Sequence, residues 1–165
     1  MKRFQTLLKY DPKLTPHEEQ VRASEGLADA LNRSHLEQWK RDQSATSHGR
    51  CLLLAIAPYS QYDLTLLDIL DESLSSQIVN DVKVFVVNLL DYQDQKELEK
   101  DFPGIGQIHQ TPIAAFWESG ELKELALGRK ARELVAEAIH VPSEELNQRV
   151  SSESPRYEPE TSGVA

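Results

Sequence analysis

The side chain in this sequence best suited to nucleophilic chemistry is a single thiol. Cys51 is the only cysteine among 165 residues, so no disulfide can form within the chain. It begins an apolar run that Pro58 ends. A free cysteine in such a run is usually a buried, unreactive core residue, because a reactive thiol needs an accessible and electropositive setting. The neighbouring Arg50 and His48 leave the alternative of a reactive Cys51 open.

A second polar segment, Tyr59 to Asp63, joins the end of this run to the start of a predicted helix. One interpretation is that Asp63 or Thr65 caps that helix, with Asp68 completing a capping box to Thr65. The other is a contact surface for a second protein, in which Tyr59 and Tyr62 supply rigid aromatic area beside Pro112. Both interpretations place the segment at a corner between strand and helix.

No other pattern in the sequence indicates catalysis or a cofactor. The histidines stand singly, without the His-x-x-x-His or Cys-plus-His spacing of a zinc site, at His17, His35, His48, His109 and His140. His109 lies nearest the predicted corner. The phosphate- and dinucleotide-binding glycine motifs are absent, and Gly104-Ile105-Gly106 is too short to be one. We therefore expect neither a metal nor a bound cofactor.

The charge and the hydropathy of the sequence limit the classes of partner that the protein could bind. The net charge is -9, and residues 51–165 alone carry 9 basic and 20 acidic side chains, for a net charge of -11. Such a body repels phosphate backbones, so we expect no binding to nucleic acid. No apolar run is long enough to span a bilayer. Together with the single cysteine this favours a cytoplasmic location.

The hydrophobic periodicity predicts an alternation of strands and helices that would position these residues. The predicted helices lie at 15–32, Ser34 to Asp42, from Tyr62 or Thr65 to Ile78, 94–101 and 131–140. The predicted strands lie at 51–57, 82–89, 112–117 and 122–127, the last two forming a hairpin. This order predicts a parallel βαβ unit followed by an antiparallel ββα unit in one central sheet.

Four segments follow from these patterns. Residues 1–14 form an N-terminal arm, 15–50 a helical segment with a polar loop, 51–141 the main domain, and 142–165 a polar tail. Apart from a weak helical patch at 143–150, we expect the tail to be disordered. The arm carries Phe4, Leu7, Leu8, Tyr10 and Leu14 among basic residues. It is either an elaboration of the fold or a weak peripheral anchor to a partner or a membrane edge.

Particular residues resemble those of the thioredoxin-like superfamily over about 90 residues, from Cys51 to His140. Residues 69–72, Ile-Leu-Asp-Glu, are similar to the first turns after the thioredoxin active site. The pair Thr111-Pro112 resembles the cis-proline that precedes a strand in the family. Three residues that follow at matching intervals resemble its hairpin and closing glycine, namely Phe116, Gly120 and Gly128.

The resemblance implies a thioredoxin-like fold, a mixed sheet flanked by helices on both faces. It also places Ser60 and Asp63 where the family has its two redox cysteines, and Leu54 where it has a buried acid. Disulfide exchange needs a thiolate and a resolving thiol, so the resemblance implies a redox-inactive member. The surface it implies for partner docking comprises Tyr59, Ser60, Gln61, Tyr62, Gln110, Thr111 and Pro112.

The hypothesis with most support at this point is a non-catalytic protein-binding module: an adaptor, assembly factor or chaperone. Hydrogenase-maturation chaperones and small clock proteins contain cysteine-free domains of this fold, an analogy at the level of the fold alone. The alternative is a thiol-dependent reductase or transferase that uses Cys51. A third hypothesis is a structural subunit joined to its assembly through the arm and the tail.

Overall fold

A single mixed sheet lies at the centre of the molecule. The computed structural model describes residues 3–8, 11–39, 44–47, 49–76 and 81–154. Within these ranges the sheet has five strands, in the order β1 (Glu37–Gln38), β3 (Val82–Asn88), β2 (Arg50–Ile56), β4 (Ile113–Glu118) and β5 (Glu121–Leu127). β1 and β2 run parallel to β3, whereas β4 is antiparallel to β2 and β5 to β4. The predicted α/β class with parallel and antiparallel pairing is confirmed.

The central strand β2 is apolar on both faces, and its alternation divides the core in two. Leu52, Leu54 and Ile56 belong to one buried cluster. Cys51, Leu53 and Ala55 belong to the other. Successive side chains of a strand point to opposite faces, so a strand buried on both sides needs helices or loops over each face.

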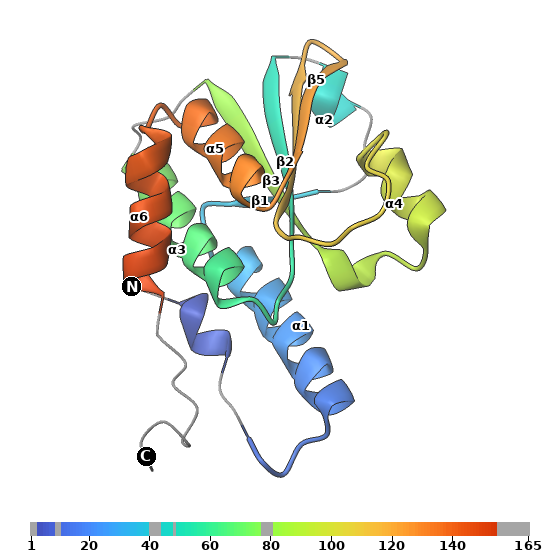
Figure 1. Ribbon diagram of the computed structural model, residues 1–165, viewed down its shortest axis with the longest axis vertical. Helices are drawn as coiled ribbons and strands as arrows, with labels where there is room; N and C mark the ends of the chain where they lie inside the picture. The colour runs from blue at the N-terminus through green and yellow to red at the C-terminus, as the bar shows by residue number, and fades with distance from the viewer. Residues whose placement is uncertain (1–2, 9–10, 40–43, 48, 77–80, 155–165) are drawn as a thin grey trace.

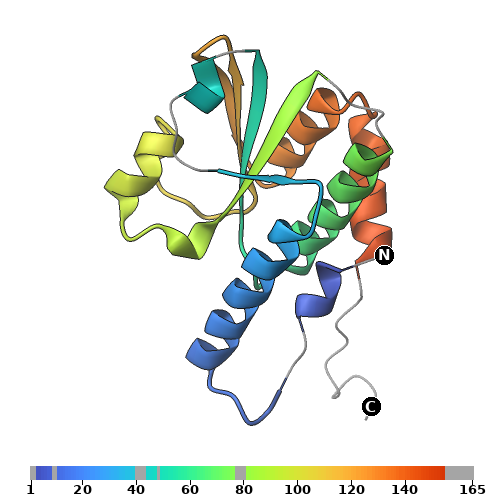
Figure 2. The same ribbon diagram turned by 180° about the vertical axis from the view of Figure 1, so that it is seen from behind.

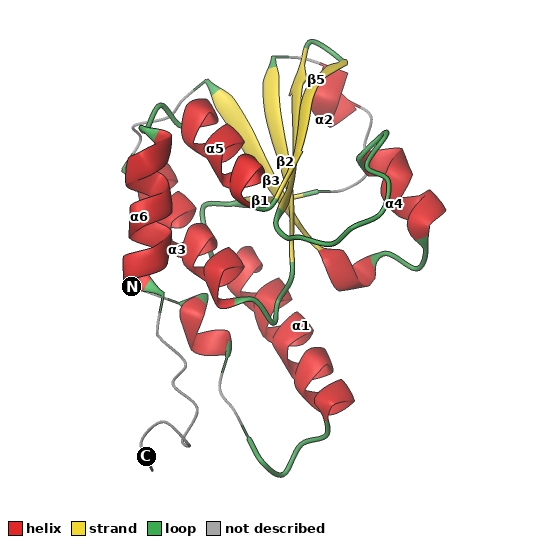
Figure 3. Cartoon of the chain, viewed as in Figure 1, coloured by secondary structure: helices red, strands yellow, loops and turns green. Residues whose placement is uncertain are grey.

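Those covering elements lie on both faces of the sheet, which Figure 1 shows nearly edge-on. The first cluster is covered by α1 (Pro16–Asn32), α3 (Gln61–Ser75), α5 (Arg129–Ala138), α6 (Ser143–Glu153) and the short 3₁₀ turn η1 (Gln5–Leu7). On the opposite side lie α2 (Ser44–Ser47) and α4 (Gln95–Asp101), and a second 3₁₀ turn, η2 (Leu89–Asp91), follows β3. The view from behind and the colouring by secondary structure show the same layers (Figures 2 and 3).

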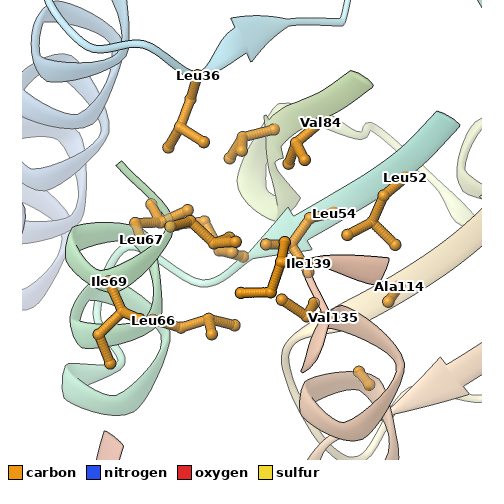
Figure 4. Packing of buried hydrophobic residues seen from close by; sticks show 14 of the residues in the cluster. Leu36, Leu52, Leu54, Leu66, Leu67, Ile69, Val84, Ala114, Val135 and Ile139 are labelled. Carbon is orange, nitrogen blue, oxygen red and sulfur yellow. The ribbon is translucent and has the colours of Figure 1, made fainter. Parts of the chain in front are cut away.

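Side chains from helices and strands meet in the larger cluster. Figure 4 shows Leu66 and Leu67 of α3 on the side of the helix toward Leu54 of β2 and Val135 of α5. Burying a side chain of this kind stabilises the fold by about 1.5–3 kcal/mol relative to leaving it exposed. The corner between β2 and α3 is therefore anchored in the larger cluster of the core.

One predicted helix is wrong. Within Ser34 to Asp42 the chain places Glu37 and Gln38 beside Phe85 and Val86 of β3, as the edge strand β1. Leu36 is buried in the larger cluster. Tertiary pairing overrides local helical preference here, because the segment gains ladder bonds at an otherwise open sheet edge. Residues 40–42 lie outside the described ranges.

The N-terminal arm is built into the fold. Phe4 is fully buried in the larger cluster, and Leu7 and Leu8 pack against it. The backbone N–H groups of Phe4 and Gln5 donate to the two carboxylate oxygens of Asp68 in α3, each over 3.0 Å. Three apolar residues of the predicted peripheral anchor therefore pack in the protein's own core. Tyr10 lies outside the described residues.

The weak helical patch expected at 143–150 is present as α6, so the expectation of disorder across 142–165 is wrong for the part that the structure describes. α6 is a regular helix that buries Leu146 and Val150 against the rest of the core. Its end is fixed by Ser154, whose hydroxyl donates to the Thr65 hydroxyl of α3 over 2.8 Å. The sequence indicated this helix only weakly, because only two apolar residues, four apart, mark its buried face. Residues 155–165 lie outside the described ranges.

Candidate functional site

The corner between β2 and α3 is capped by Ser60. Its side-chain oxygen accepts the N–H of Asp63 over 3.3 Å, which makes Ser60 the N-cap of α3. The capping roles predicted for Asp63 and Thr65 are wrong. Thr65 lies inside the first turns and donates to the Gln61 carbonyl, while Asp68 binds the arm. A serine is among the best N-cap residues, so the hydroxyl at this position has a structural function.

Two tyrosines project from this corner. Tyr59 is 54% exposed and Tyr62 is 48% exposed, and they are two of the few large apolar side chains among the described residues that face solvent. Pro58 beneath them is buried, and Gln61 is half-buried. The guanidinium of Arg132 in α5 lies over the Tyr62 ring, 6.0 Å from its centroid. This cation–π contact orients Tyr62 toward α5 and α6.

The loop before β4 forms the second half of the corner. The Thr111–Pro112 peptide bond is cis, and Pro112 is buried. The Pro112 carbonyl accepts the N–H of Gly128 over 2.8 Å. Gly128 has a φ of 60°, and a Cβ there would lie 2.1 Å from the side-chain oxygen of Gln110. The exposed Gln110 side chain could move aside for a Cβ, but the positive φ favours glycine at this position.

Asp63 lies between the two halves of the corner, and sequence reasoning missed its role. Its side chain is fully buried, and one carboxylate oxygen accepts the N–H of Ala57 over 2.9 Å. The other oxygen has no hydrogen-bond partner among the described residues. Burial raises the pKa of Asp63 to about 6, although interactions with Ala57, Thr111, Ser60 and Arg132 oppose the rise. The structure therefore brings the segments at residues 59–63 and 110–112 together around a buried carboxyl.

Arg132 and Asn147 extend the site toward α6, and neither was singled out from the sequence. The Arg132 Nε–H donates to the Asn147 side-chain oxygen over 2.9 Å. The signal that could have found Arg132 is the group of three cations, Arg129, Lys130 and Arg132, directly after Gly128 in an otherwise acidic segment.

The thiol of Cys51 is buried in the core and is almost inaccessible to solvent. It is 1% exposed inside the smaller cluster. Burial, with a smaller contribution from Glu37, raises the pKa of its thiol to about 12, while Lys83 opposes the rise. Arg50 forms an ion pair with Asp81 over 2.6 Å, and His48 lies outside the described residues. The burial agrees with the interpretation of Cys51 as a core residue.

Within the described ranges no group of three or more His, Cys, Asp or Glu side chains converges as a metal site would require. Nor does any helix described here combine the length and apolar character needed to cross a membrane. Comparisons with protein-family models and with curated proteins find no match to this chain. The corner must therefore be interpreted from its own geometry.

Proposed function

We propose that this chain is a redox-inactive thioredoxin-like protein that binds another protein at the corner formed by Tyr59, Tyr62 and the Thr111-Pro112 loop. The observation that carries the proposal is the pair of exposed tyrosines at a corner that also contains the cis-proline loop. Aromatic side chains on a rigid support supply large contact area at little cost in conformational entropy. Such a surface is consistent with the role of an adaptor, assembly factor or chaperone for another protein.

The strand order β1-β3-β2-β4-β5, with helices on both faces, supports the thioredoxin-like assignment. So does the cis bond before Pro112, the position at which the resemblance implies one. The resemblance places Ser60 and Asp63 at the family's two redox cysteines. Ser60 is engaged as a helix cap and Asp63 is buried, and neither side chain can form the mixed disulfide of an exchange reaction. This supports binding without redox chemistry.

The alternative of a thiol-dependent enzyme finds no support in the placement of Cys51. A thiol that is 1% exposed and holds its proton strongly is a poor nucleophile. We therefore expect insulin disulfides to be reduced no faster with the purified protein than without it. Reduction above that rate would exclude the non-catalytic function.

The proposed docking surface is tested by affinity capture from native extract with three forms of the full-length chain. The wild type is compared with the double variant Tyr59→Ala/Tyr62→Ala and with Val21→Ala, which truncates an equally exposed apolar side chain on α1. Proteins recovered by the wild type and by Val21→Ala are expected to be depleted about tenfold or more with the double variant, the effect of losing two aromatic anchors. Far-UV circular dichroism checks that the double variant is folded. Equal recovery with all three baits would contradict the proposal.

A further inference from the structure

A hollow of about 410 Å³ opens beside Tyr62, between α3, α5 and α6. Most of the residues that line it carry hydrogen-bond donors, namely Arg129, Arg132, Asn147, Gln148, Tyr62 and Ser151, and one, Glu144, carries a carboxylate. The Asn147 oxygen is already used by Arg132, which leaves its NH₂ group for another acceptor. A site that offers donors in excess suits an anionic or acceptor-rich ligand.

The charge around this hollow differs from that of the segment to which it belongs. Residues 51–165 have nine basic side chains, and three of them, Arg129, Lys130 and Arg132, occupy the first turn of α5. That turn contains no acidic residue, and its N-cap, Gly128, provides no side-chain cap. Cations near a helix N-terminus are unfavourable, because the helix dipole is positive there. The arrangement destabilises the free protein locally unless an anion binds.

Arg132 is the group that most clearly lacks a counter-ion. Six of the seven arginines in the described ranges form an ion pair with a carboxylate. Arg132 is the exception among them: its Nε–H donates to the neutral amide of Asn147, and its guanidinium lies over the Tyr62 ring. It is half-buried, and burial lowers its pKa. The carboxylates of Asp63 and Glu133 raise the pKa of Arg132 electrostatically, but they lie beyond ion-pair distance. A half-buried cation without an ion pair is costly, so a carboxylate brought by a ligand would bind it strongly.

We propose that this hollow receives the carboxylate of an aspartate or glutamate side chain from the polypeptide that docks at the Tyr59–Tyr62 corner. The inference rests on the proposed function and adds the chemistry of the partner: an acidic residue beside an apolar one, the latter packing on the Tyr62 ring. Residues 51–165 are too acidic overall to bind a polyanion such as nucleic acid, and Glu144 is itself among the residues that line the hollow. A single carboxylate fits this small group of cations.

The test selects peptides from a phage-displayed library of random decapeptides on immobilised full-length protein. Three baits are used in parallel: the wild type, Arg132→Gln, and Lys123→Gln, which removes an exposed cation from β5. The wild type and Lys123→Gln are expected to enrich peptides that share an Asp or Glu next to an apolar residue. Arg132→Gln is expected to lose that acidic preference.

The most enriched peptide is then synthesised with its shared acid and with the corresponding Asn or Gln. We expect binding to weaken about tenfold when the peptide acid is neutralised, and about tenfold with Arg132→Gln. The two changes together should weaken it by much less than the product of the single effects, because both remove the same interaction. Competition by inorganic phosphate against chloride of equal ionic strength should be weak. Efficient displacement by phosphate would instead assign the hollow to a small anion and overturn the inference.

Other outcomes separate this inference from the proposed function. Enriched peptides without an acidic preference, whose binding still depends on Tyr62, would overturn the carboxylate site and leave the docking corner standing. Failure of the wild type to enrich any peptide would overturn the inference, while capture from extract that depends on Tyr59 and Tyr62 would still support the corner. Binding that survives both Tyr62→Ala and Arg132→Gln would overturn both.

Discussion

At the scale of single residues, Asp63 combines complete burial with incomplete hydrogen bonding. One of its oxygens binds the Ala57 N–H and the other has no partner among the described residues. Burial disfavours the ionised carboxylate and raises its pKa from 3.8 to about 6. Ionisation of Asp63 therefore lowers the free energy of unfolding. The buried carboxylate responsible lies at the same corner as the two exposed tyrosines.

The pH dependence of stability follows from this shift. The folded protein holds the Asp63 proton more tightly than the unfolded chain, so the contribution of Asp63 is fully present below about pH 3.8 and is lost as the pH rises through about 6. Between about pH 5 and pH 8 we expect the free energy of unfolding to fall by about 1.4 kcal/mol on account of Asp63. Asp63→Asn should abolish this fall and be about 1–3 kcal/mol more stable than the wild type at about pH 8. Urea denaturation at both pH values measures it.

The matched control for Asp63 is Glu137→Gln, which removes one negative charge from an exposed position on α5. It is expected to keep the pH dependence of the wild type. If Asp63→Asn and Glu137→Gln showed the same profile, Asp63 would not be the buried acid that controls stability in this pH range.

The second prediction at this scale concerns Cys51. Its thiol pKa is about 12 in the folded chain against 9.0 for an unperturbed thiol, so the reactive thiolate is about a thousandfold rarer in the native state. Labelling by a chromogenic disulfide reagent at about pH 8 should therefore be at least about a thousandfold slower in native protein than in urea. Fast native labelling would restore the thiol-dependent alternative.

At the scale of elements, the sequence predicted what depends on strong apolar patterns. The runs at β2 and β3, the β4–β5 hairpin and the helices α3 and α5 were all expected, because buried strands and amphipathic helices need many apolar side chains. The elements that were missed, or indicated only weakly, depend on few residues. β1 is two residues long and exists by pairing with β3, and α6 is marked by Leu146 and Val150 alone.

The candidate site was foreseen to a similar extent. The segments at residues 59–62 and 110–112 were predicted from a resemblance and lie together, but Asp63 was expected to cap a helix and Arg132 was not considered. Both depend on contacts between distant segments. Whether Asp63 caps a helix or is buried is decided by the Ala57 N–H and the neighbouring Thr111, which local sequence does not reveal.

α6 provides the prediction that belongs to this scale. Leu146 is 1% exposed, so Leu146→Ala should lower the free energy of unfolding by about 2–5 kcal/mol. Gln148→Ala, an exposed position on the same helix, should change it by less than about 0.5 kcal/mol. Urea denaturation followed by circular dichroism compares the two variants. A cost for Leu146→Ala no larger than that for Gln148→Ala would mean that α6 does not pack on the core in solution.

At the scale of the whole molecule, both ends of the described chain are fastened to α3, the helix that begins at the candidate corner. The arm binds through Asp68 and through the ion pair of Arg3 with Asp71. The end of α6 binds through Thr65. In Figure 1 the arm and the end of α6 lie near each other beside α3. The position of the exposed tyrosines is therefore set by segments from opposite ends of the sequence.

This arrangement predicts that the molecule unfolds as one unit. Both tryptophans, Trp39 and Trp117, pack against the smaller cluster, whereas most of the helical residues cover the larger one, and β2 contributes to both. Tryptophan fluorescence and far-UV circular dichroism should therefore give superimposable urea transitions. Phe4→Ala, which empties a fully buried position in the larger cluster, should lower the stability by about 3–5 kcal/mol and shift both transitions equally. If only the circular dichroism transition moved, the two faces would unfold independently, and the arm would stabilise α3 without stabilising the sheet.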